Sequence, residues 1–168
     1  MSPPRRVTLV ADAEDTLITI NRVISLLRAK RFAVVSVSTA RILAQGRVRL
    51  TIVVDAEATS PAWVVACLAK LEDVWNVAVF DHANGLCREL ALVKMTVPSA
   101  APSLPPAVAM RNDVRVIHRV DQVVVLEVVA APQDVDDVIQ ALDPSAVVDI
   151  VRAHQLAIGT EPSSRRHT

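Results

Sequence analysis

The spacing of apolar residues in the first half of the chain changes repeatedly between two periods, and this constrains the fold most. A short apolar run at 7–11 predicts a strand. Apolar residues then recur at three- and four-residue steps, which predicts a helix capped by Asp15 or Thr16. We expect its buried face to comprise Leu17, Ile20, Ile24 and Leu27. The run 32–37 predicts a second, buried strand.

The segment Arg47–Asp55 alternates with a period of two, after a hairpin turn predicted at 44–47. Its even positions are apolar, whereas Arg47, Arg49 and Thr51 point the other way, so we expect a half-buried strand with one solvated face. Ser60 and Pro61 then predict a helix start. That helix would bury Val64, Leu68 and Leu71, and the run 74–80 predicts the next strand.

These elements follow the order β-α-β-β-α-β. That order is typical of the ferredoxin-like arrangement, in which two helices cover a four-stranded antiparallel sheet. The sequence therefore predicts an α+β domain over residues 1–83.

A degenerate second copy of this arrangement is predicted over residues 84–160. Strands are expected at 88–97, 114–118, 123–130, 146–150 and 156–158. A helix beginning at Pro132 would bury Val135, Val138, Ile139 and Leu142. Four prolines in 98–106 leave room for only about one turn of the first helix, around 107–111. The polar segment 161–168 is expected to be a flexible tail.

Composition argues against several classes of partner. Eighteen basic and eighteen acidic residues give no net charge, so no field attracts nucleic acid or a membrane surface. No segment reaches the roughly 18 apolar residues of a membrane span. The two cysteines and four histidines have no disulfide or metal-ligand spacing. We expect a cytoplasmic protein that binds no metal, cofactor, nucleic acid or membrane.

No motif for catalysis is present. The sequence lacks a glycine-rich phosphate loop and a nucleophile motif. Asp136, Asp137 and Asp143 are expected to be solvent-facing helix charges rather than general acids or bases, because no partner group is identifiable. We therefore expect a non-catalytic protein.

Three motifs stand out along the chain: Arg49-Leu-Thr-Ile-Val-Val-Asp55, Leu68-Ala-Lys-Leu-Glu-Asp-Val-Trp-Asn-Val77 and Cys87-Arg-Glu-Leu-Ala-Leu-Val-Lys-Met95. They resemble segments of a known family, the small subunits of acetolactate synthase. The segment 135–159 is similar to the family's final helix and strands. The resemblance implies an N-terminal ACT domain that forms a homodimer. It also implies a catalytic partner subunit that carries thiamine diphosphate, FAD and magnesium. The small subunits of this family raise the activity of that partner and, in many members, confer feedback inhibition by valine.

The chain departs from that family at the effector pocket. The family has an acidic residue and Pro-Gly after the first strand, where this chain has Asp12-Ala-Glu-Asp-Thr-Leu17. A family Gly and Asn near the second strand are replaced by Arg31 and Ala33. Without glycine the backbone approaches a ligand less closely, and three acids would repel a carboxylate. We expect a degenerate effector pocket, with weak or absent valine binding, formed by Asp12, Glu14, Asp15, Thr16, Ala33 and Val34.

The acidic segment has an alternative interpretation, which acidic first turns of helices commonly have: a solvated helix start stabilised by the helix dipole. Arg88 and Lys94 either contact the catalytic partner or solvate one sheet face. The main functional prediction is an activating regulatory subunit of acetolactate synthase in branched-chain amino-acid biosynthesis. The alternative is a stand-alone ACT-type module that binds a small ligand, dimerises and regulates another enzyme.

Overall fold

A computed structural model describes residues 5–42, 46–80, 85–97 and 104–160, without the side chain of His154. The chain divides into two compact units, 1–86 with 156–168 and 87–155. The predicted tail 161–168, His82, His167 and the first two residues of the predicted 44–47 turn lie outside the described residues. No helix in the described part of the chain is long and apolar enough to cross a bilayer.

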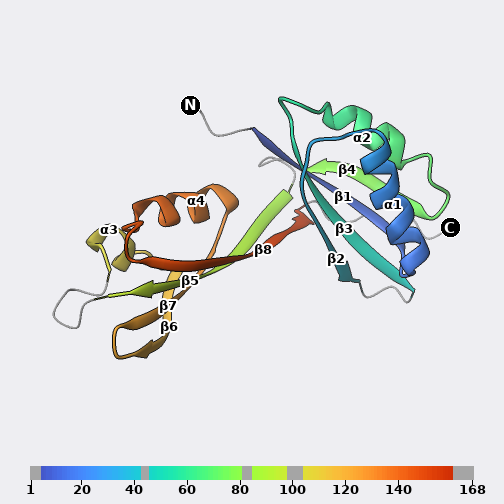
Figure 1. The fold of residues 1–168 in the computed structure, drawn as a ribbon. Helices are drawn as coiled ribbons and strands as arrows, with labels where there is room; N and C mark the ends of the chain where they lie inside the picture. The colour runs from blue at the N-terminus through green and yellow to red at the C-terminus, as the bar shows by residue number, and fades with distance from the viewer. Residues whose placement is uncertain (1–4, 43–45, 81–84, 98–103, 161–168) are drawn as a thin grey trace. The chain divides into compact units, whose positions relative to one another are not determined.

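The first unit has the predicted β-α-β-β-α-β order (Figure 1). Its sheet has the strand order β2-β3-β1-β4, and the three neighbouring pairs are antiparallel. Both helices lie on one face of this sheet. The elements are β1 (Arg6–Glu14), α1 (Leu17–Ala29), β2 (Val34–Arg41), β3 (Arg47–Asp55), α2 (Pro61–Leu68) and β4 (Val74–Phe80).

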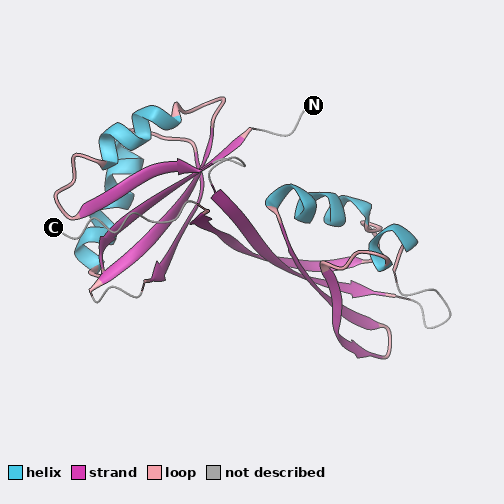
Figure 2. Cartoon of the chain, turned by 180° about the vertical axis from the view of Figure 1, so that it is seen from behind, coloured by secondary structure: helices cyan, strands magenta, loops and turns pink. Residues whose placement is uncertain are grey.

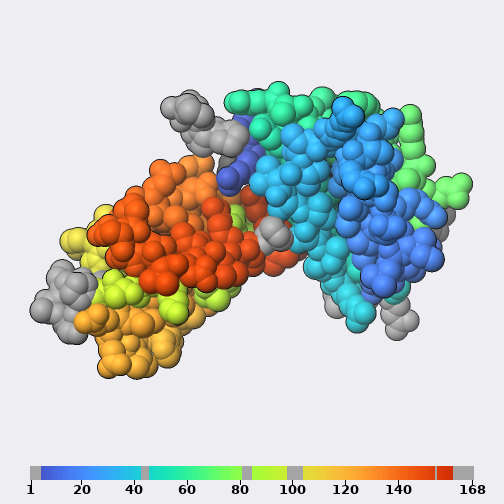
Figure 3. Space-filling view, viewed as in Figure 1, coloured from blue at the N-terminus to red at the C-terminus, as the bar shows by residue number. Residues whose placement is uncertain are grey.

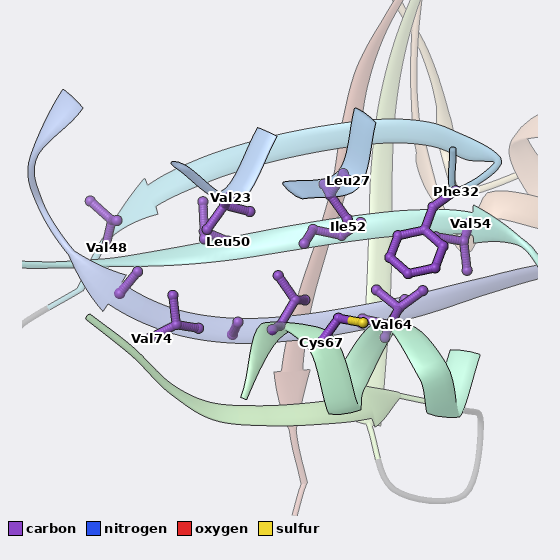
Figure 4. Close-up of a cluster of buried hydrophobic side chains, with 14 residues drawn as sticks. Val23, Leu27, Phe32, Val48, Leu50, Ile52, Val54, Val64, Cys67 and Val74 are labelled. Atoms are coloured by element: carbon purple, nitrogen blue, oxygen red, sulfur yellow. The ribbon is translucent and has the colours of Figure 1, made fainter. Parts of the chain in front are cut away.

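The core of this unit fills the space between the two helices and the sheet (Figure 4). Val23 and Leu27 of α1 point into this core, as do Val64 and Cys67 of α2, which is the packing of a two-layer domain. Phe32 meets Trp63 edge to face, with ring centroids 4.9 Å apart. The strands contribute Leu9, Ala11, Ala13, Val48, Leu50, Ile52, Val54 and Val74.

The buried face of α1 differs from the predicted one. Thr19, Val23 and Leu27 are buried, whereas Leu17 is 85% and Ile24 47% exposed. The helix carries two apolar stripes, and polar contacts decide which one packs. The Thr19 hydroxyl donates to an Asp73 carboxylate oxygen at 2.9 Å, which turns the Thr19 side of the helix inward. The prediction from apolar spacing was therefore wrong for Leu17 and Ile24.

The solvated face predicted for β3 is also largely wrong. Thr51 is 4% and Val53 1% exposed, although both point away from the helices. Thr8 and Val10 of the neighbouring strand β1 are buried as well, at 7% and 3% exposed, so this face of the sheet is not solvated here. Arg49 is half-buried, and only Arg47 is exposed as predicted.

The second unit repeats the topology with a reduced first helix. Its sheet has the strand order β6-β7-β5-β8, the same permutation as in the first unit. The first helix is one short turn, as predicted, and the strand predicted at 123–130 is found at those bounds. The elements are β5 (Gly85–Thr96), α3 (Pro106–Ala109), β6 (Val114–Val120), β7 (Val123–Ala130), α4 (Pro132–Ala141) and β8 (Val147–Gly159).

The last strand corrects another prediction. The two short strands predicted at 146–150 and 156–158 are parts of one continuous strand, β8. The polar residues between them broke the apolar pattern on which the prediction relied. Arg152 is one of these residues, and it lies inside the strand.

The core of the second unit lies between its sheet and α3 and α4, which cover one face (Figure 2). Val135 and Val138 of α4 are buried as predicted, with Ile139 partly buried. Alternate residues of β5 and β7 face these helices, as the period of a strand requires. They are Ala91, Val93, Met95, Val124, Leu126, Val128 and Ala130.

Candidate functional site

Asp12 lies inside β1 rather than in the loop that follows it. It is only 6% exposed. Arg49 Nε donates to Asp12 Oδ1 at 2.9 Å, and Asn76 Nδ2 donates to Asp12 Oδ2 at 3.0 Å. Hydrogen bonds of this kind satisfy a buried carboxylate. Both carboxylate oxygens of Asp12 therefore already accept hydrogen bonds from side chains of neighbouring strands in the same sheet.

The remaining acidic residues flank the start of α1. Arg41 Nε donates to Asp15 Oδ2 at 3.0 Å. The Thr16 hydroxyl accepts a hydrogen bond from the Thr19 amide at 3.1 Å, so Thr16 is the helix cap, one of the two predicted candidates. Glu14 is exposed at the end of β1.

Asp73 ties the start of α1 to the turn before β4, a role that sequence reasoning missed. Its carboxylate accepts from the Thr19 hydroxyl and from Arg22 Nη1 at 2.6 Å. These contacts hold the pKa of Asp73 below its ordinary value, the Thr19 hydroxyl contributing most. No local pattern identifies this contact, because Asp73 and Thr19 are 54 residues apart.

The charges around the acidic segment are balanced. Arg49 pairs with Asp12 and Arg41 with Asp15. Arg47 lies opposite Glu14 in the sheet register, with its guanidinium 4.9 Å from the centroid of the Trp75 ring. Three arginines thus accompany the three acids, so repulsion of a ligand carboxylate does not follow from these residues.

The other two predicted pocket residues lie at the opposite end of the sheet. Val34 pairs with Val54, which in turn pairs with Val7 near the start of β1. Ala33 donates its amide to the Thr59 hydroxyl at 2.7 Å. Val7 and Glu14 are separated by roughly 23 Å at about 3.3 Å per residue. A single chain therefore brings Glu14, Asp15 and Thr16 together but leaves Ala33 and Val34 apart from them.

Arg31 occupies the position before β2 at which the resembling family has a glycine. Its φ is 53°, in the left-handed region that glycine enters readily. The backbone after α1 thus keeps a glycine-like conformation while the side chain has changed. The unusual residue at this position was visible in the sequence, but its backbone conformation was not.

A partly buried ion network lies in the second unit. Arg152 of β8 donates to Glu89 of β5 and to Asp136 of α4. Its Nη2 atom is buried and has no hydrogen-bond partner among the described residues. Asp136 is therefore held by a cation rather than facing solvent as predicted. The network joins an edge strand to the rest of its sheet and to the covering helix.

No three His, Cys, Asp or Glu side chains of the described residues gather as metal ligands. Cys67 is buried in the first core, and Cys87 is partly exposed. The two predicted partner-contact residues, Arg88 and Lys94, are both exposed on β5. They point away from α3 and α4, on the face opposite Ala91 and Val93.

Comparison with known proteins accounts for both units. Residues 15–77 match the ACT domain family, and residues 88–161 match the family described as the small subunit of acetolactate synthase. The acetolactate synthase small subunit of Mycobacterium leprae is 28% identical over 92% of each chain. That of Mycobacterium bovis is 24% identical over 95% of each.

A solved structure has the same fold. The acetolactate synthase small subunit of Thermotoga maritima superposes with a TM-score of 0.80 at 19% identity, covering 94% of this chain and 99% of that one. Two ferredoxin-like units, the first of them an ACT domain, define a two-domain protein of the regulatory-subunit class. The chain belongs to the acetolactate synthase small-subunit family, as its resemblance in sequence indicated.

Proposed function

We propose that this chain is an activating regulatory subunit that binds the catalytic subunit of acetolactate synthase and responds weakly or not at all to valine. The match of residues 88–161 to the small-subunit family carries this proposal. The partner would carry thiamine diphosphate, FAD and magnesium and would perform the chemistry in the cytoplasm. Activation of this kind is an allosteric coupling, typically of about 1–3 kcal/mol.

A homodimer formed by the first domain, residues 1–83, is part of this proposal. β2 is an edge strand of its sheet, and Val35 on it is 49% exposed. The stripe of α1 that carries Leu17 and Ile24 is exposed as well, and α1 forms part of the surface seen in Figure 3. Exposed apolar surface beside an open sheet edge favours pairing with a second copy. The second domain would span 84–160.

The predicted effector segments favour a weak response to valine. Glu14, Asp15 and Thr16 lie far from Ala33 and Val34 within one chain, so a pocket containing both sets requires two chains. In such a pocket Ala33 has no side-chain donor, and its backbone amide is already bonded to Thr59. No glycine precedes α1 to let a ligand approach the backbone.

The test is an assay of acetolactate formation by the catalytic subunit of the same organism. We expect a rise in rate on adding this chain, a complex in size exclusion, and no reversal by millimolar valine. Strong inhibition by valine would contradict the weak pocket. Absence of both the complex and the rise would favour a stand-alone ACT module that regulates another enzyme.

A further inference from the structure

The sheet of the second unit has one face that its helices do not cover. The register places alternate residues of three adjacent strands on this face. One row across the sheet is Leu92, Glu127 and Arg115, and the next is Lys94, Val125 and His118. We call this surface the open face; its described members are Arg88, Leu90, Leu92, Lys94, Thr96, Arg115, His118, Val120, Val123, Val125, Glu127 and Val129.

The open face is more apolar than the free side of an antiparallel sheet usually is. Such a side normally alternates toward polar residues. Here Val129 is 44% and Val120 54% exposed, and Leu90 and Leu92 are half-exposed beside them. Contiguous exposed apolar surface with a polar margin marks an interaction site in soluble proteins.

The charged members of the open face are predominantly basic. Arg88, Lys94 and Arg115 are exposed cations. Glu127 is the only carboxylate among the described members, and it lies directly opposite Arg115 in the register. No other member named for these three strands carries a carboxylate to balance Arg88 and Lys94. Surfaces that bind each other are complementary in charge, so this face selects an acidic partner.

A second copy of the chain is a poor occupant. Two open faces brought together would oppose six cations to two carboxylates, and like charges in contact are costly. The edge β2 and the exposed stripe of α1 already offer a separate surface for self-association.

We propose that the open face binds the catalytic subunit, through a surface with an apolar centre and carboxylates at its margin. This inference rests on the proposed function and names the part of the chain that would make the contact. Lys94 would meet a carboxylate of the partner beside apolar contacts made by Leu92 and Val125.

Charge reversal with a matched control tests the open face. Lys94→Glu replaces an exposed strand cation on the open face, and Arg119→Glu does the same on the other side of the sheet, where Arg119 pairs with buried Val124. Binding of the full chain to the purified catalytic subunit is measured by calorimetry at low and high salt. We expect the Kd to rise about tenfold or more for Lys94→Glu and to change less than about twofold for Arg119→Glu.

The outcomes separate this inference from the proposed function. If the unmodified chain does not bind the catalytic subunit, the proposed function fails, and the assignment of the open face fails with it. If the unmodified chain binds and both variants bind equally well, the open face is wrong and the function stands. If Lys94→Glu weakens self-association in sedimentation instead, a second copy occupies the face and the inference is overturned. Thermal unfolding of both variants checks that each remains folded.

Discussion

At the scale of single residues, Arg31 keeps a backbone conformation that its side chain does not favour. Arg31, Asn76 and Asp121 are the non-glycine residues with positive φ in the described part of the chain. Asn and Asp tolerate this region because their short side chains bond locally. Arginine has no such compensation, so Arg31 is held there by the packing of Phe32 immediately after it, which is only 8% exposed.

The cost of this conformation predicts the effect of replacing Arg31. Arg31→Gly should raise the free energy of unfolding by up to about 1 kcal/mol, because glycine avoids a left-handed penalty of about 1–2 kcal/mol and loses part of that gain in chain entropy. Urea unfolding measures the change. Arg28→Gly, one turn earlier and inside α1, should lower stability by about 1 kcal/mol. Equal loss in both variants would show that Arg31 is not strained.

At the scale of elements, α1 is positioned by a polar contact as much as by its apolar side chains. Asp73 accepts from Thr19 and Arg22 and so fixes which stripe faces the sheet. Strands were easier to predict than this helix face. The bounds of β3 follow from alternation in the sequence, and those of β4 and β7 match the strands predicted there. Two apolar stripes on one helix leave the choice to a residue far away in the chain.

Contacts between distant residues also limited how much of the candidate site could be predicted from the sequence. The segment 12–16 was recognisable from its charges, and Thr16 from its capping chemistry. The partner of Asp12 was not, because Arg49 lies 37 residues away and meets it only through sheet pairing. The separation of Ala33 from Glu14 likewise depends on register, which local sequence patterns do not give.

The contact of Asp73 makes the stability of α1 depend on pH. Because the folded pKa of Asp73 is lowered from 3.8, its contribution is present above that value and disappears as pH falls through the folded pKa. The difference in unfolding free energy between the unmodified chain and Asp73→Asn should therefore shrink on acidification. Urea unfolding across a series of acidic pH values measures it.

The neighbouring Glu72 provides the control for this prediction. Glu72 is exposed, so Glu72→Gln should change stability little at neutral pH. If the difference in unfolding free energy between the unmodified chain and Asp73→Asn stays constant down to the lowest pH, protonation of the Asp73 carboxylate does not affect stability and the prediction is wrong.

At the scale of the whole molecule, the two proposed associations use different units. The first unit presents an apolar helix stripe and an edge strand, and the second presents a basic, apolar sheet face. The first surface suits a second copy, and the second suits an acidic partner. Changes in one unit should therefore alter one association and leave the other intact.

Self-association is testable with two equally exposed side chains. Leu17 and Met110 are each 85% exposed. Leu17→Asp should weaken the homodimer about tenfold or more in sedimentation equilibrium, because it places a charge in an apolar contact. An acid in the first turn of α1 suits the helix dipole, so the fold should survive. Met110→Asp should leave the dimer unchanged, and equal weakening by both would remove the α1 stripe from the interface.

The shared strand order of the two sheets has a consequence for biosynthesis. In each unit the first strand made, β1 or β5, occupies a central place, and both its neighbours are made later. While the chain emerges from the ribosome, β1 waits for β3 and β4 and cannot complete its sheet before Phe80 is available. Pairing between such distant segments folds slowly. Each nascent unit therefore carries a central strand with at least one open edge until its last strand is made, and during that time the chain would depend most on chaperones.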